Sequence, residues 1–111
     1  MALTIKKGDA YPIPMVVKLN GQVIDDGTIY SVQIVEFQLQ DLRKEWRADG
    51  TGEVTYENGV FWFPMSQIES FAFRAGKIKL DTRVKTINGW VQGAPDMHSV
   101  AVQAAASRKE L

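Results

Sequence analysis

The fold is decided by the stretch Lys77-Ile-Lys-Leu-Asp-Thr-Arg-Val-Lys-Thr-Ile-Asn-Gly-Trp-Val-Gln-Gly93. Two sets of residues alternate along its first half: Ile78, Leu80, Thr82 and Val84 on one face, and Lys77, Lys79, Asp81, Arg83 and Lys85 on the other. Because side chains of a strand point to alternate faces, this pattern predicts a β-strand with one face in the core and the other in solvent. Asn88-Gly89 tolerates the positive φ of a type I′ hairpin turn, so we expect Trp90 and Val91 to begin a return strand.

Turn signals divide the rest of the chain into short strands. Asn-Gly occurs at positions 20, 58 and 88, and Asp-Gly at 26 and 49. Further strands are expected at residues 2–6, around 11–14 as an edge strand, in a 15–24 hairpin, and at 29–40, 43–47, 54–57, 60–64 and 98–104. This spacing is typical of an all-β sandwich or barrel. We predict an antiparallel β-sandwich of about seven to nine short strands, with one domain over residues 1–106 and a mobile tail over 107–111.

Two interruptions of the β pattern are expected. Val32 and Ile34 share one face of the 29–40 run, but Val35 and Phe37 continue on the other parity, which predicts a bulge near Ile34-Val35. Ser66 followed by Glu69 fits a capping box, so a single helical turn is expected near residues 65–70. Glu36 lies within the 29–40 run and is interpreted as a solvent-facing or edge residue rather than a catalytic carboxylate.

The composition narrows the function classes. The chain has 111 residues, of which 45% are hydrophobic, and 13 basic residues balance 13 acidic ones. A nucleic-acid or anionic-membrane surface normally shows a basic excess, so we expect neither partner. No apolar run approaches the ~20 residues of a membrane span, and residues 1–8 lack the hydrophobic core of a secretory signal. We therefore expect a soluble domain without a secretory signal, which could leave its cell only by lysis, as part of an assembly or by another route.

The chemically reactive side chains are few. There is no cysteine, and the single histidine, His98, is interpreted as a strand-end surface residue. Asp25, Asp26 and Asp49 lie in glycine-containing turns, where turn formation explains them better than calcium binding, because the spacing of an EF-hand is absent. We expect no catalytic, cofactor or metal site, and we do not expect an enzyme.

Three features expected at the surface are candidate partner contacts. Lys77, Lys79, Arg83 and Lys85 form the only notable charge cluster, although Asp81 lies within it and neighbouring strands can place acids opposite it. Phe61 and Phe63 should face the core, which leaves Trp62 outward, and an outward tryptophan suggests a partner surface. Trp90 is the third candidate. An alternative is a sugar-stacking platform built from aromatic rings, with the candidates Trp46, Tyr56, Trp62 and Trp90.

Several stretches together resemble a known group of proteins. They are Gly8-Asp-Ala-Tyr-Pro12, Val35-Glu-Phe37 with Arg43-Lys44, Tyr56-Glu-Asn-Gly-Val-Phe-Trp-Phe-Pro64, Ser66-Gln67, and Arg83-Val-Lys85 with Asn88-Gly89 and Gly93. They are similar to small structural-module proteins of phages and prophages of Gram-positive bacteria, in particular to the immunoglobulin-like N-terminal domain of baseplate upper proteins. The motifs are turn-and-strand patterns without invariant chemistry. Baseplate upper proteins continue into a long C-terminal part, whereas this sequence ends at Leu111, so we expect a stand-alone module.

The resemblance implies a non-enzymatic structural role in a tail, a baseplate or a head–tail connection. The implied fold is an immunoglobulin-like β-sandwich, and the implied partners are other virion proteins or further copies of the chain. The expected location is the virion or, before assembly, the host bacterial cytoplasm. The alternative hypothesis is a carbohydrate- or host-surface-binding module that uses exposed tryptophan.

Overall fold

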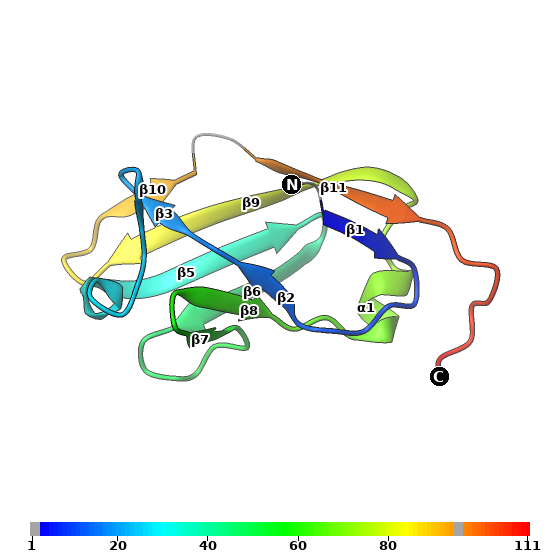
Figure 1. Ribbon diagram of the computed structural model, residues 1–111, viewed down its shortest axis with the longest axis horizontal. Coiled ribbons are helices and arrows are strands. Elements are labelled where there is room, and N and C mark those ends of the chain that lie inside the picture. Colours follow the sequence, from blue (N-terminus) through cyan, green and yellow to red (C-terminus); the bar gives the residue numbers. More distant parts are fainter. Residues whose placement is uncertain (1–2, 95–96) are drawn as a thin grey trace.

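The computed structural model describes residues 3–94 and 97–111, and its regular structure is almost entirely β (Figure 1). The strands are β1 Leu3–Lys6, β2 Ile13–Met15, β3 Lys18–Leu19, β4 Gln22–Val23, β5 Val32–Leu39, β6 Leu42–Arg47, β7 Thr55–Glu57, β8 Val60–Phe63, β9 Gly76–Thr86, β10 Val91–Gly93 and β11 His98–Gln103. A 3-10 turn, η1, covers Ile29–Ser31, and a short helix, α1, covers Gln67–Phe71. The all-β prediction is confirmed, with more strands than the seven to nine expected.

The strands form one large sheet and two small ones. The large sheet has the order β1-β11-β9-β5-β6, and β10 also pairs with β9. A second sheet has the order β2-β8-β7, which makes β2 an edge strand as expected, and β3 pairs with β4. The prediction of a wholly antiparallel fold was wrong at one place, because β1 runs parallel to β11, with Leu3 opposite Val100. Three strands, β5, β10 and β11, pair with β9, which is therefore the central strand of the large sheet.

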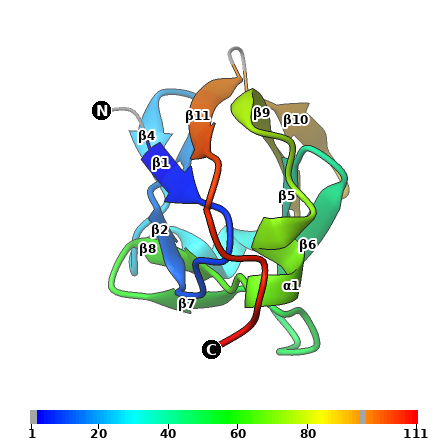
Figure 2. The same ribbon diagram turned by 90° about the vertical axis from the view of Figure 1, so that its right-hand side faces the viewer.

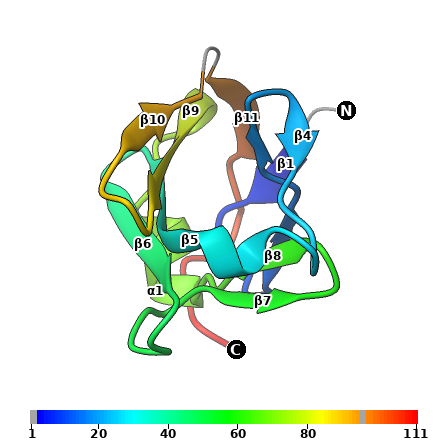
Figure 3. The same ribbon diagram turned by 90° about the vertical axis from the view of Figure 1, so that its left-hand side faces the viewer.

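The core lies between the large sheet and the β2-β8-β7 sheet. End-on views show the large sheet curling around the interior while the second sheet closes the opposite side (Figures 2 and 3). Phe37 on β5 meets Phe61 and Phe63 on β8, with ring centroids 6.0 and 6.3 Å apart. The predicted inner face of β9 is confirmed at Ile78 and Val84, which are both buried.

The Asn-Gly turns behave in two ways. Asn20 and Asn58 have φ of 53° and 51°, each before a positive-φ glycine, as the predicted two-residue turns require. The prediction was wrong at Asn88, which is not among the positive-φ residues of the described chain. There, the Gly89 N–H donates to the Thr86 carbonyl and the Thr86 N–H donates to the Trp90 carbonyl, both at 2.9 Å. These bonds close a three-residue loop over 87–89, which places Trp90 at the end of the loop, and β10 starts only at Val91.

The start of β5 also differs from expectation. Residues 29–31 form η1 rather than the beginning of a strand. The predicted bulge exists but lies slightly earlier, since the register against β9 shifts between Val32 and Ile34. The extra residue sends these two side chains to opposite faces, so Val32 is buried and Ile34 is only half-buried.

The predicted capping box is confirmed at the start of α1. The Ser66 side chain accepts from the Glu69 N–H, and Glu69 accepts from the Ser66 N–H. Glu69 also pairs with Lys44 of β6 at 2.9 Å. The buried Ser70 hydroxyl accepts from the Gly8 N–H at 2.9 Å and lies 2.8 Å from the Asp9 carbonyl. These contacts fix α1 against both the N-terminal turn and the edge of the large sheet.

Candidate functional site

The predicted charged face of β9 lies on the outer side of the large sheet. Lys77, Lys79 and Arg83 are exposed, and Lys85 is half-buried. The Lys79 ammonium group donates to the Ser99 hydroxyl of β11 at 2.9 Å. The alternation predicted from the sequence thus presents these cations on one surface.

Arg83 is held in a charge network centred on Glu36. Arg83 Nη2 lies 2.7 Å from Glu36 Oε1, and Arg43 Nε lies 2.6 Å from Glu36 Oε2. Burial raises the pKa of Glu36, but the hydrogen bonds from Arg83 and Arg43 outweigh it and leave that pKa below its ordinary value. The hydrogen bond to Glu36 in turn raises the pKa of Arg43. Glu36 therefore balances part of the β9 charge, and Lys77, Lys79 and Lys85 remain the cations of β9 outside any ion pair of the described residues.

Of the aromatic residues considered for a platform, only Trp46 and Tyr56 lie together, with ring centroids 6.4 Å apart. The Trp46 ring packs edge-on against the buried Phe61 ring, with centroids 5.8 Å apart. The Tyr56 ring packs against Phe61 at a tilt, with centroids 5.0 Å apart. Trp62 does point away from Phe61 and Phe63, but it is half-buried in register with Pro14 and Thr55 on its flanking strands. Trp90 lies in the loop after β9 and is 74% exposed. A continuous sugar-binding platform of these rings is therefore absent from the described residues.

Trp90 instead belongs to a cluster of exposed apolar side chains at one end of the molecule. We call it the apolar tip and define it as Tyr30, Ile87, Trp90 and Val91, which are 60 to 76% exposed. The Ile87 N–H donates to the Ser31 carbonyl at 3.0 Å, which brings η1 and Tyr30 beside the β9–β10 loop. In Figure 1 the tip occupies the left-hand end.

Sequence reasoning found Trp90 but missed the rest of the tip. One signal was available: Ile87 falls at the parity of Lys77 to Lys85, where β9 otherwise places charged residues. An apolar residue in that series indicates either the end of the strand or a contact surface. Tyr30 carried no such signal, because its proximity to the β9–β10 loop depends on the long-range pairing of β5 with β9.

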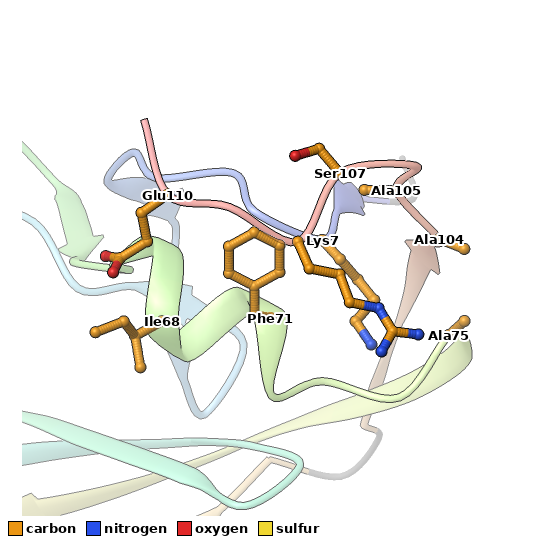
Figure 4. Close-up of a pocket in the computed structure, with 9 residues that line it drawn as sticks. Lys7, Ile68, Phe71, Ala75, Ala104, Ala105, Ser107 and Glu110 are labelled. Atoms are coloured by element: carbon orange, nitrogen blue, oxygen red, sulfur yellow. The ribbon is translucent and has the colours of Figure 1, made fainter.

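An open groove lies at the opposite end of the molecule, between α1 and the C-terminal residues (Figure 4). Its volume is about 500 Å³, and its lining residues are Lys7, Ile68, Phe71, Ala75, Ala104, Ala105, Ser107, Arg108 and Glu110. The Leu111 N–H donates to Gln67 Oε1 at 2.9 Å, so residues 107–111 run beside α1. Figure 4 shows the Phe71 ring at the centre of this groove. We call it the C-terminal groove.

The turn aspartates are engaged in the local bonds expected of turn residues. Asp25 Oδ1 accepts from the Gly27 N–H at 3.0 Å and from the Thr28 hydroxyl at 3.1 Å. Asp49 Oδ1 accepts from the side chain and N–H of Thr51, and these bonds lower the pKa of Asp49. Within the described ranges, no group of three histidine or acidic residues is arranged to hold a metal ion, and His98 is exposed.

Comparison with protein-family models, curated proteins and solved structures gives no significant match to this chain. No helix of the described residues is long and apolar enough to cross a membrane.

Proposed function

We propose that the chain is a non-enzymatic structural protein of a phage or prophage virion, located in the tail, the baseplate or the head–tail connection. It acts through contacts with other virion proteins and is present in the virion or, before assembly, in the host bacterial cytoplasm. The two facing β-sheets support the finer assignment to an immunoglobulin-like sandwich that the sequence resemblance implies.

The observation that carries the proposal is the apolar tip. Contiguous exposed apolar side chains are uncommon on soluble monomers and mark sites of protein interaction. Tryptophan and tyrosine are the residue types that contribute most binding energy at such interfaces. Trp90 and Tyr30 are 74% and 76% exposed. The exposed cations Lys77 and Lys79 lie near the start of β9, at the far end of this strand from the tip, and provide a separate charged contact surface.

The test is the presence of the chain in assembled particles. Prophage would be induced in the bacterium that encodes the chain, and particles would be purified on a density gradient. Quantitative mass spectrometry should then find the chain at a fixed ratio to the major tail protein across gradient fractions. Its presence in cells together with its absence from every particle fraction would contradict the proposal.

A second candidate function is binding of cell-wall carbohydrate, and the exposed indole of Trp90 is the observation that favours it, since sugars stack on flat aromatic rings. It is weakened because Trp46, another platform candidate, is half-buried and packs edge-on against Phe61. Titration of tryptophan fluorescence with purified cell-wall polysaccharide separates the candidates. A saturable change that disappears in Trp90→Ala would favour carbohydrate binding, and no change in the wild type would dispose of it.

A further inference from the structure

The apolar tip and the C-terminal groove are joined by a single strand. Ala75 of the groove immediately precedes β9, and Ile87 of the tip immediately follows it. An extended strand of 11 residues spans about 34 Å, within a molecule whose longest extent is 47 Å. The two surfaces therefore face away from each other along the long axis (Figure 1), and one molecule cannot place its tip in its own groove.

The two surfaces are chemically complementary. Small side chains, those of Ala75, Ala104 and Ala105, leave room in the groove beside the Phe71 ring, and this suits a flat aromatic side chain. Lys7 and Arg108 line the same groove, and a cation beside an indole face is a favourable pairing.

The charges near the two surfaces are also complementary. Asp25 and Asp26 are exposed in the turn that leads into η1, where the Ile29 N–H donates to the Asp25 carbonyl at 2.8 Å, and they outnumber the one cation at the tip, Lys85, which is the register partner of Val91. The groove carries two cations against the single carboxylate of Glu110. Formal net charge is +0 for the whole chain, so two copies meet without net repulsion.

We infer that the tip of one molecule docks in the C-terminal groove of a second copy, with Trp90 against Phe71 and between Lys7 and Arg108. The inference depends on the proposed role of the tip as a protein-contact surface. The contact is heterologous: each molecule keeps one free tip and one free groove, so association continues into a ring or a linear stack rather than stopping at a dimer.

The experiment uses sedimentation velocity over a range of concentrations with four proteins: wild type, Trp90→Ala, Ala104→Glu and Ala48→Glu. Ala104→Glu puts a carboxylate and extra volume into the groove, and Ala48→Glu makes the same change at an exposed loop position that belongs to neither surface. The wild type and Ala48→Glu should associate with rising concentration. Trp90→Ala and Ala104→Glu should each weaken association about tenfold or more, as expected for a central interface residue. Thermal unfolding of each variant checks that it is folded.

The decisive measurement is sedimentation velocity of a mixture of the two weakened variants. Trp90→Ala retains an intact groove and Ala104→Glu an intact tip, so an equimolar mixture should form a heterodimer that does not grow further. A wild type that stays monomeric, an Ala104→Glu variant that associates like the wild type, or a mixture without heterodimer would each overturn the inference. A monomeric wild type that is nevertheless found in particles would leave the virion role intact, whereas self-association without incorporation into particles would contradict the virion role alone.

Discussion

The Ile87 N–H donates to the Ser31 carbonyl at 3.0 Å, so the loop after β9 is tied to the 3-10 turn before β5. Together with the pairing of β5 against β9, this bond holds two segments that are more than fifty residues apart in sequence. It places Tyr30 beside Ile87 and Trp90, all of which are exposed. A surface fixed by the backbone in this way needs little reordering to bind a partner, which lowers the entropic cost of association.

The exposure of Trp90 makes its contribution to folding small. Trp90→Ala should change the free energy of unfolding by about 0.5 kcal/mol or less, because surface substitutions away from special contacts have effects of this size. Phe37→Ala, at a fully buried position of the same sheet, should cost about 3–5 kcal/mol. Urea unfolding followed by circular dichroism measures both. A loss above about 1.5 kcal/mol for Trp90→Ala would show that the indole is part of the core rather than of a contact surface.

Gly52 allows the chain to cross the end of β6. A Cβ built on this residue would overlap the Glu45 carbonyl oxygen, which already accepts the Val54 N–H at 3.0 Å. Gly52→Ala should therefore cost about 2–3 kcal/mol, because backbone rather than a side chain must move. Gly27→Ala is the matched control, since the nearest atom there is a flexible Asp25 oxygen at 3.3 Å, and its cost should stay below about 1 kcal/mol. Equal losses for the two variants would contradict this explanation.

Ser70 connects α1 to the N-terminal turn. Its hydroxyl accepts from the Gly8 N–H and contacts the Asp9 carbonyl in a site with no solvent exposure. Ser70→Ala leaves these groups without that partner, and we expect a loss of about 1–3 kcal/mol in chemical denaturation. Ser99→Ala removes an equivalent hydroxyl on the surface and should be close to neutral. A neutral Ser70→Ala would mean that water replaces the hydroxyl.

The Glu36 network predicts acid sensitivity with a defined sign. The pKa of Glu36 is lowered in the folded state, so the unfolded chain binds its proton more readily. The stabilising contribution is thus present above the unfolded pKa and is lost as the pH falls through the folded pKa, over a window of about pH 5 to 3. Because Arg43 and Arg83 are half-exposed and screened by solvent, we expect the effect to be about 1 kcal/mol at most.

The measurement is the free energy of unfolding of wild type and Glu36→Gln between pH 7 and pH 3. Their difference should shrink as the pH falls, and added salt should reduce it at pH 7. Glu57→Gln, at an exposed position on β7, is the control that should not reproduce this narrowing. A difference that stays constant over the whole pH range would rule out a role for the charge of Glu36.

The local features of the fold were predictable because they depend on neighbouring residues. The alternation of Ile78 and Leu80 with lysines, the turns at Asn20 and Asn58, and the capping box at Ser66 each follow from a few consecutive side chains. The turn at Asn88 was mispredicted because the dipeptide permits two loop geometries, and the pairing of Thr86 with Trp90 selects the longer one. The parallel pairing of β1 with β11 joins the two ends of the chain, and no local pattern encodes it.

The candidate surfaces were predictable only in part for the same reason. Trp90 stood out as a tryptophan at a turn, but its neighbour Tyr30 arrives through the register of β5 against β9. Arg83 was expected among the contact residues, and the structure ties it to Glu36 on the adjacent strand. The groove combines Lys7, Phe71 and Arg108, which come from three distant segments. Surfaces assembled across strands require the three-dimensional register, which the sequence pattern leaves open.

The central claim, that the chain joins a virion through its apolar tip, is tested most directly by incorporation of variants into particles. Wild type, Trp90→Ala and Ala48→Glu would be expressed at equal levels from the native locus, and each would be quantified by mass spectrometry in purified particles. The claim predicts that Ala48→Glu is incorporated like the wild type and that Trp90→Ala falls about tenfold or more, while remaining folded in the cell. Incorporation of Trp90→Ala at the wild-type level would contradict it.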